Sequence, residues 1–274
     1  MVLTRNDLAL AALACSAGAA ILAVRAAALA SDTKPDGSPV TEADRRAERI
    51  ILDGIAVIWP GLPVIAEEAV SGGQVPVVAD TFVLVDPLDG TREFIAGRAE
   101  FTVNIALVRH RVPVCGVVFA PATGAMFLAG EGGGAWRADV DGCRPPGDGA
   151  FRRIGVRPCG AGLVALVSHS HGDEMTEAWL AGQPVVARRN IGSSLKFCLI
   201  AAGEADVYPR FGPTMEWDTA AGDAVLRAAG GKVLQPDGAP FLYGKAATGF
   251  RNGPFIAPGV GHTDRREEDL HLDR

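Results

Sequence analysis

Two acidic residues three positions apart follow an apolar segment of this 274-residue chain, and they are the first candidates for chemistry. Asp86 and Asp89 belong to the sequence VDPLDGTREF at 85–94, directly after the apolar run TFVLV. A plain turn explains the Asp-Pro and Asp-Gly pairs, but it does not explain two carboxylates at the end of a buried strand. Clustered carboxylates repel one another and are costly to desolvate unless a cation neutralises them. Because oxygen ligands select hard ions, the pattern indicates Mg²⁺.

The turn after Asp86 has further features of an ion and phosphate site. Pro87 stiffens the turn, which would allow the backbone carbonyl of Leu88 to join the ligands. Gly90 allows the backbone to approach a ligand closely. If a helical turn begins at Thr91, the amides of Gly90 and Thr91 would face a bound phosphate.

Three other segments carry acidic residues that could join the same site. Glu67 and Glu68 follow the apolar run LPVIA, in the same position relative to a strand, although adjacent acids are usually solvated. Asp218, in the sequence EWDTAAG, stands where a helix N-cap belongs, and the small residues after it would let the helix end approach another backbone. Asp44, in the sequence VTEAD, is equally explained as an acid in the first turn of a helix.

Apolar periodicity and turn residues place these acids on an alternating series of helices and strands. In the first part we expect helices at 8–24 and 41–58, a loop at 69–76, and strands at 62–66, 81–85, 101–108, 112–119 and within the hairpin 124–138. In the second part we expect strands at 163–168, 184–188 and 205–208 and helices at 173–181, 193–202 and 218–229. A Gly-, Pro- and Asp-rich stretch at 139–149 separates the parts, which predicts an N-terminal α+β domain at 1–145, a C-terminal α/β domain at 146–258 and a polar tail at 259–274.

Composition limits the class of protein. The formal net charge is −6 and no basic face is visible, which argues against a nucleic-acid polymer as a partner. The chain has five cysteines, an odd number, and no two of them are spaced as CxxC, which does not favour a disulfide framework or a structural zinc site. We therefore expect free thiols in a reducing compartment. The uncharged run at 8–24 could be an export leader or a membrane anchor, but alanine dominates it, Arg25 interrupts it and no basic segment precedes it. We therefore expect a core helix, no transmembrane segment and a cytoplasmic protein, with peripheral association at the inner membrane left open.

Several linked motifs resemble those of the inositol monophosphatase superfamily. They are DGSPVTEAD at 36–44, AEE at 66–68, VDPLDGTREF at 85–94, GSSLKFC at 192–198, YPRFGPTMEWDTAAGDAV at 208–225 and AAGG at 228–231. The resemblance covers residues 5–257, and Arg92-Glu93-Phe94 is similar to the superfamily's branch of bacterial 3′(2′),5′-bisphosphate nucleotidases. It implies a five-layer αβαβα sandwich of the inositol monophosphatase and fructose-1,6-bisphosphatase type, with the metals where the two domains meet.

The resemblance also implies a role for each candidate residue. Glu67, Asp86 and the carbonyl of Leu88 would hold one Mg²⁺, and Asp86, Asp89 and Asp218 would hold a second. The implied catalytic residues are Asp44, Thr91 and Glu67, with Thr91 and Asp44 orienting and deprotonating the attacking water with help from a third, weaker ion. Gly90 and Thr91 would bind the scissile phosphate, and Glu67, Leu88, Asp89 and Asp218 would also contact the substrate. Two cations that bind the attacking and the leaving oxygen suit the in-line displacement by which water would cleave a phosphate ester.

For the nucleotidase branch the resemblance implies hydrolysis of adenosine 3′,5′-bisphosphate to AMP and phosphate in sulfur metabolism, with 3′-phosphoadenylyl sulfate as a second substrate and inhibition by Li⁺. Ser193, Lys196 and Arg210 would contact the nucleotide, whose second phosphate needs a cation away from the metals. His169 and His171 could suggest a zinc site, but no third ligand is apparent. Because their segment resembles a Ser-Arg-Ser-His stretch of such enzymes, with His169 in place of the arginine, the resemblance implies a substrate-lining or hydrogen-bonding role. An inositol or sugar phosphatase remains an alternative, as does an inactive binding protein, and the chain could be a monomer or a homodimer.

Overall fold

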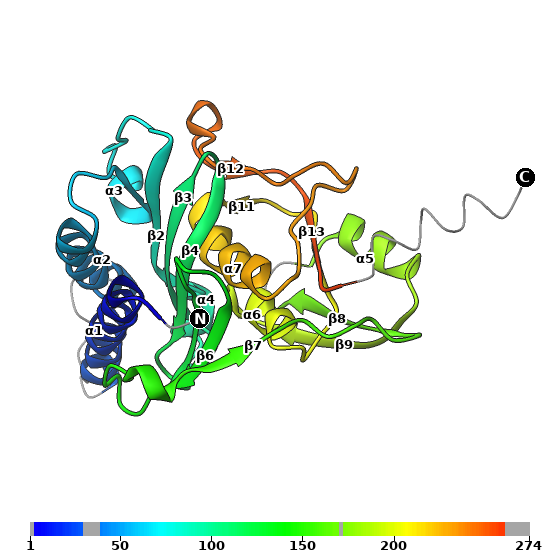
Figure 1. The fold of residues 1–274 in the computed structure, drawn as a ribbon, viewed down its shortest axis with the longest axis horizontal. Coiled ribbons are helices and arrows are strands. Elements are labelled where there is room, and N and C mark those ends of the chain that lie inside the picture. Colours follow the sequence, from blue (N-terminus) through cyan, green and yellow to red (C-terminus); the bar gives the residue numbers. More distant parts are fainter. Residues whose placement is uncertain (1–2, 30–38, 170–171, 261–274) are drawn as a thin grey trace, which may run out of the picture.

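Five layers of helices and strands make up the fold. The computed structural model describes residues 3–29, 39–169 and 172–260, without the side chains of residues 28, 29 and 39–41. The predicted polar tail lies outside these residues apart from its first two positions. Helices occupy the two outer layers and the middle layer, and a sheet lies in each space between (Figure 1). The predicted layered α/β sandwich is therefore confirmed.

The first two layers are a pair of helices and a seven-stranded sheet. Helices α1 (Arg5–Leu29) and α2 (Pro39–Ile58) lie side by side and cover one face of the sheet (Figure 1). Its strands follow in chain order: β1 (Val64–Ala66), β2 (Thr81–Asp89), β3 (Thr102–Arg109), β4 (Val112–Ala120), β5 (Ala125–Ala129), β6 (Ala135–Asp139) and β7 (Arg152–Ile154). Neighbours are antiparallel except for the parallel pair β1 and β2. The apolar faces of the helices and the sheet form one core, which includes Leu10, Ile51 and Phe119.

The other three layers follow from the C-terminal part of the chain. Helices α6 (Leu195–Ala201) and α7 (Glu216–Ala228) form the middle layer, and α5 (Glu174–Ala181) lies outermost (Figure 1). The second sheet has the order β13 (Phe255–Pro258), β10 (Val207–Arg210), β8 (Leu163–Ser168) and β9 (Val185–Ile191). A small sheet pairs β11 (Thr214–Met215) with β12 (Arg251–Asn252). One core joins the first sheet, the middle helices and the second sheet, so the two halves share their packing.

Small residues allow α7 to lie between the sheets. A Cβ atom added at Gly222 would lie 2.5 Å from the Phe197 ring of α6, and one added at Gly116 of β4 would lie 3.2 Å from the Cα of Ala221. These distances leave no room for a side chain, so the glycines set how closely the helix approaches its neighbours. The predicted close approach of the small residues after Asp218 is confirmed.

Helix α1 is partly a core element. Over Arg5–Ala27 it is long and apolar enough to cross a membrane, with a mean hydropathy of 2.0, yet 56 % of its most apolar window is buried inside the fold. A buried core helix meets the same criteria, so this one helix is weak evidence for a membrane span. All five cysteines are free thiols, as predicted.

Four local predictions differ from the structure. Residues after β1 form a short helix, α3 (Glu67–Ser71), where we expected a loop from residue 69. Strand β2 continues to Asp89 with a register shift after Asp86, and α7 begins at Glu216, so that Asp218 is not its N-cap. Strand β7 lies beyond residue 145 yet belongs to the first sheet. The domain boundary at 145 remains a prediction.

Candidate active site

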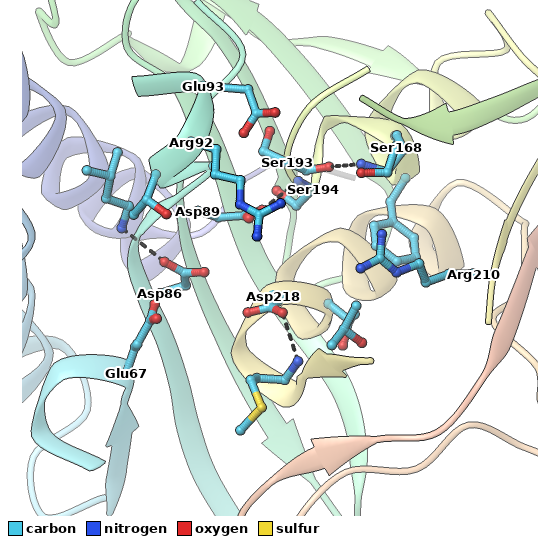
Figure 2. Close-up of a pocket in the computed structure, with 18 of the residues that line it drawn as sticks. Glu67, Asp86, Asp89, Arg92, Glu93, Ser168, Ser193, Ser194, Arg210 and Asp218 are labelled. Atoms are coloured by element: carbon cyan, nitrogen blue, oxygen red, sulfur yellow. Dashed lines mark hydrogen bonds between the residues drawn. The ribbon is translucent and has the colours of Figure 1, made fainter. Parts of the chain in front are cut away.

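A pocket of about 250 Å³ opens where both halves of the chain meet. Its lining includes five acidic residues, Glu67, Asp86, Asp89, Glu93 and Asp218, and three basic residues, Arg92, Lys196 and Arg210. Figure 2 shows Glu67 and Asp86 next to each other, Asp218 facing them across the pocket, and Arg210 on the far side. The four predicted acidic metal ligands therefore converge although they are distant in sequence.

Parallel strands bring Glu67 and Asp86 together. Strands β1 and β2 run parallel, and the register pairs Ala66 with Val85, so the residue after each comes to the same edge. Glu67 is the first residue of α3, and Asp86 is almost fully buried on β2. The Leu88 amide donates a hydrogen bond of 3.0 Å to Oδ1 of Asp86, which turns the chain back toward the pocket. Leu88, whose backbone carbonyl was predicted to be a metal ligand, also lines the pocket.

Gly90 and Thr91 begin helix α4 (Thr91–Ile95) at the pocket, as the sequence predicted. Gly90 has a φ of +93°, and a Cβ there would lie 2.9 Å from the carbonyl oxygen of Glu100. Only glycine adopts this conformation without strain, so the turn depends on this residue. The turn therefore brings Gly90 and Thr91 into the lining of the pocket that also contains Asp89.

Asp89 is held by residues that the sequence did not identify. Its Oδ2 accepts hydrogen bonds from the Ser194 amide at 2.6 Å and from Nδ2 of Asn104 at 3.3 Å. The Ser194 hydroxyl lies 2.7 Å from Oδ1 of Asn104 and 2.9 Å from the Thr102 hydroxyl. Asn104 is a polar residue between Val103 and Ile105 in the buried part of strand β3, which was the available signal.

Asp218 is positioned by the start of α7. It is the third residue of that helix, and its Oδ2 accepts a 2.8 Å hydrogen bond from the Met215 amide just before the helix. An acid one turn inside the helix therefore satisfies a free amide and still faces the pocket.

Burial and mutual repulsion raise the pKa values of the carboxyls. Burial and the charges of Glu67 and Asp89 raise the pKa of Asp86 well above its ordinary value. Burial and the Asp44 charge raise the pKa of Glu67 to about 7, although a hydrogen bond with Asp86 opposes this. Burial and Asp89 raise the pKa of Asp218 to about 8. The crowded acids therefore retain protons near neutral pH unless a cation compensates their charge.

This donor set fits a hard divalent cation, but the ligands are not yet gathered around one point. Among residues 3–29, 39–169 and 172–260, no three His, Cys, Asp or Glu side chains form a ready-made metal-binding group. The facing acids are nevertheless all oxygen donors, and their raised pKa values reflect burial and mutual repulsion, both of which a bound cation would offset.

Asp44 lies behind the pocket and outside its lining. It is 3 % exposed on α2, and burial together with the charges of Glu68 and Glu48 raises its pKa to about 7. Glu48 accepts a 2.9 Å hydrogen bond from the Glu68 amide, which fixes the start of α3. Helix α2 therefore contributes two buried acids near the start of α3: Asp44, whose charge raises the pKa of Glu67, and Glu48, which the sequence did not identify.

The predicted substrate contacts lie at the other end of the pocket. Lys196 is 3 % exposed. Its Nζ donates hydrogen bonds to the carbonyls of Ser193 at 2.7 Å and Ile191 at 3.1 Å. The same nitrogen lies 4.9 Å from the centre of the Tyr208 ring. Burial lowers the pKa of Lys196 to about 8. Arg210 and Ser193 also line the pocket, and Ser193 has a left-handed φ of +49°.

Other predictions about this end of the pocket have mixed outcomes. His169 lies outside the pocket lining and places Nε2 3.5 Å from a carboxylate oxygen of Glu100, while His171 lies outside the described residues. The lining residues that the sequence reasoning did not assign are Arg92, Glu93, Ser168, Ser194, Phe197, Tyr208, Thr214, Met215 and Thr219. The Arg92 side chain extends from α4 into the pocket (Figure 2).

Known proteins resemble this chain over most of its length. The model of the inositol monophosphatase family matches residues 5–262. The 3′(2′),5′-bisphosphate nucleotidase CysQ of Escherichia coli strain K12 is 45 % identical over 233 residues, which are 84 % of this chain and 91 % of that protein. The crystal structure of CysQ from Bacteroides thetaiotaomicron has a TM-score of 0.80 at 38 % identity and covers 94 % of this chain and 98 % of its own. An inositol monophosphatase from Anabaena has a TM-score of 0.72 at 27 % identity, covering 96 % of this chain and 94 % of its own.

Proposed function

The chain belongs to the inositol monophosphatase family, and from this we propose that it is a 3′(2′),5′-bisphosphate nucleotidase that hydrolyses adenosine 3′,5′-bisphosphate to AMP and phosphate. The observation that carries the proposal is one pocket that holds the acids Glu67, Asp86, Asp89 and Asp218 and also two buried cations, Lys196 and Arg210. The acids suit metal ions at the scissile phosphate. The cations suit a second phosphate, which a monophosphate substrate lacks.

We assign two or three Mg²⁺ ions to the acidic end. The oxygens of Glu67, Asp86, Asp89 and Asp218 and the carbonyl of Leu88 would hold them. When bound, the ions supply positive charge that stabilises the transferred phosphoryl group in the transition state. The raised pKa values of Asp86 and Asp218 support this assignment, because burial and repulsion both penalise the ionised carboxylates and bound cations would compensate their charge.

The protein's own groups would bind the phosphate and handle the proton of the attacking water. The amides of Gly90 and Thr91 would bind the scissile phosphate, and the Thr91 hydroxyl would orient the water. Asp44, which is not among the proposed metal ligands, has a pKa of about 7 and could accept a proton at neutral pH. Glu67 would act beside it as an ionised ligand. Asp44 stands behind Glu67, and its role would pass through Glu67 and Thr91.

The cationic end would select the nucleotide. Lys196 and Arg210 would pair with the phosphate that is not cleaved, and Ser193 would contact the sugar or the phosphate beside them. Buried cations interact strongly with an anion because little water screens them. The same contacts would accept 3′-phosphoadenylyl sulfate, so we place the enzyme in sulfur metabolism. The CysQ relatives support this substrate class through their names.

A substrate panel tests the proposal. Turnover of adenosine 3′,5′-bisphosphate, adenosine 3′-phosphate and inositol 1-phosphate should be compared with Mg²⁺, with a chelator, and with Mg²⁺ plus Li⁺. We expect the bisphosphate to have the highest kcat/KM, no turnover without the metal, and inhibition by Li⁺. A higher kcat/KM for inositol 1-phosphate would reject the nucleotidase and favour an inositol phosphatase.

We also propose a cytoplasmic location. The packing of α1 into the first core supports a helix that belongs to the fold. Fractionation of cells that express the full chain should recover it without detergent. Recovery only after detergent extraction would instead favour a membrane-anchored protein.

A further inference from the structure

A pair of polar residues on the outermost helix holds the loop that follows Arg210. Asp173 is the N-cap of α5, where Oδ1 accepts a 2.8 Å hydrogen bond from the Thr176 amide and Oδ2 accepts a 2.6 Å hydrogen bond from the Thr176 hydroxyl. Beyond this cap, Oδ2 accepts a 3.2 Å hydrogen bond from the Gly212 amide. The Thr176 hydroxyl oxygen accepts one of 3.2 Å from the Phe211 amide. Two consecutive amides of the loop 211–213 are therefore tied to α5.

The same loop orients the Arg210 side chain. Nε of Arg210 donates to the Gly212 carbonyl at 3.3 Å, and one terminal nitrogen donates to the Pro213 carbonyl at 3.1 Å. Gly212 lies between the two groups, because a Cβ there would be 3.5 Å from Oδ2 of Asp173 and 3.6 Å from Nε of Arg210. The loop thus presents amides to α5 on one side and carbonyls to the guanidinium on the other.

The contacts form a continuous path from α5 to the pocket. Arg210 is 6 % exposed and lines the pocket, whereas Asp173 and Thr176 lie outside the lining. Burial alone raises the pKa of Asp173, but hydrogen bonds from Thr176 and Gly212 and the nearby Arg210 charge bring it below its ordinary value. Asp173 is therefore ionised at neutral pH, and its hydrogen bonds to the loop are charge-assisted.

We propose that Asp173 and Thr176 are positioning residues that hold Arg210 in the orientation needed to bind the distal phosphate of a bisphosphorylated nucleotide. The inference rests on the proposed function for its substrate. Asp173 and Thr176 hold the loop whose carbonyls fix the Arg210 guanidinium. This arrangement lowers the conformational entropy that Arg210 must lose when it binds the phosphate. It should therefore act on substrate affinity and leave the chemistry at the metals unchanged.

Helix capping alone would also explain an acid at position 173. The variant Asp173→Ser separates capping of α5 from the contact with the loop 211–213. Serine caps helices as well as aspartate does, so α5 keeps its N-cap. Its shorter side chain cannot also reach the Gly212 amide. Thr176→Val is a second variant, which removes the hydroxyl that accepts from Phe211 and keeps the buried volume. Glu177→Gln is the matched control, because Glu177 is on the same helix but pairs outward with Arg188.

The test measures KM and kcat for adenosine 3′,5′-bisphosphate and adenosine 3′-phosphate, together with binding of adenosine 5′-phosphate by calorimetry. For Asp173→Ser and Thr176→Val we expect KM for the bisphosphate to rise about tenfold with kcat nearly unchanged, as for loss of one hydrogen bond in a charged network. Affinity for adenosine 5′-phosphate should fall by the same factor. KM for adenosine 3′-phosphate, which lacks the distal phosphate, should not change, and Glu177→Gln should behave as the unaltered protein.

The outcomes separate this inference from the proposed function. If the unaltered protein shows no preference for the bisphosphate over adenosine 3′-phosphate, the nucleotidase assignment fails, and with it the substrate on which the inference rests. If that preference exists but both variants keep it, the positioning role is wrong and the assignment stands. Equal losses for both substrates would also overturn the positioning role, because they indicate general damage to the fold.

Discussion

The backbone amide of Ser194 donates a 2.6 Å hydrogen bond to Oδ2 of Asp89, although the two residues are 105 positions apart. Asp89 ends β2 in the first sheet, whereas Ser194 directly precedes α6 in the middle layer. Lys196 is on that helix and donates to the Ser193 carbonyl. The contact therefore joins a proposed metal ligand to the segment that carries two proposed substrate contacts.

Asn104→Ala should loosen this connection. Asn104 is 1 % exposed, donates to Asp89 and accepts from the Ser194 hydroxyl, so alanine leaves two buried polar groups without this partner. We expect the metal-free protein to lose about 2 kcal/mol of unfolding free energy. Mg²⁺ affinity should fall roughly tenfold, since outer partners orient metal ligands. Urea unfolding and the Mg²⁺ dependence of the melting temperature measure both effects.

The matched control for this change is Asn190→Ala, which removes the same side chain from an exposed position on β9. It should alter neither the unfolding free energy nor the Mg²⁺ affinity. An unchanged Mg²⁺ affinity in the Asn104 variant would show that Asp89 does not need its hydrogen bond from Asn104 to bind the ion.

Asp218→Asn should remove Mg²⁺-dependent hydrolysis while the fold survives. The amide oxygen can still accept from the Met215 amide, so the start of α7 keeps its hydrogen bond. Since burial and repulsion raise the pKa of Asp218 to about 8, removing the charge should leave the metal-free melting temperature unchanged or higher above that pH. Asp89→Asn should likewise lose Mg²⁺-dependent activity.

The control is Asp53→Asn, at an exposed site on α2, which should change neither the activity nor the melting temperature. A lower metal-free melting temperature for Asp218→Asn alone would contradict repulsion among the acids.

The metal-free protein should lose stability as the pH rises. The pKa of Asp44 rises from 3.8 to about 7 and that of Glu67 from 4.5 to about 7 on folding. The folded chain therefore binds more protons than the unfolded chain between these values, and its unfolding free energy falls as pH rises through the folded pKa. We expect a loss of at least about 2 kcal/mol between about pH 5 and pH 7.5 in a chelator, measured by urea unfolding.

Bound Mg²⁺ should flatten that pH dependence, because ligated carboxylates stay ionised. The stabilisation by Mg²⁺ should accordingly grow with pH. A metal-free stability that increases over the same range would mean that the acids do not repel one another in the folded chain.

The sequence predicted the convergence of the four acidic residues in one pocket because its signals are local. Asp86 and Asp89 follow a fully apolar run, and Glu67 follows another, so an ordinary pattern already placed them at strand ends. Parallel pairing of β1 and β2 then makes their convergence unavoidable. The position of Asp218 was misread by one helical turn because aspartate is favoured both at the N-cap and in the first turn.

The parts that the sequence did not predict depend on distant contacts. Asn104 and Ser194 lie 90 positions apart, and neither has a local pattern that names its partner. Helix α3 has only five residues, too few for a periodic signal. Strand β7 is the exposed sequence RRI, which shows no alternation and joins the sheet only because β6 offers it an edge.

Lys196→Met should impair nucleotide selection more than hydrolysis. Methionine fills a similar volume against the Tyr208 ring but removes the charge that faces the proposed distal phosphate. We expect kcat/KM for adenosine 3′,5′-bisphosphate to fall roughly 100-fold, as for a buried charged contact, with a smaller loss for adenosine 3′-phosphate. Lys232→Met, at an exposed position, is the control. An unchanged ratio between the two substrates would show that Lys196 does not read the second phosphate.

Gly222→Ala should test whether the middle layer sets the geometry of the pocket. The added methyl group would lie 2.5 Å from the Phe197 ring, so the Phe197 side chain or the helices α6 and α7 must shift. Overpacking of this kind costs about 1–3 kcal/mol in unfolding free energy. Because Asp218 and Lys196 are on these two helices, kcat/KM should fall more steeply than the stability loss alone explains. Gly132→Ala, where a Cβ meets nothing within 4 Å, should leave both quantities unchanged, whereas full activity in Gly222→Ala at reduced stability would mean that the spacing of α6 and α7 does not shape the site.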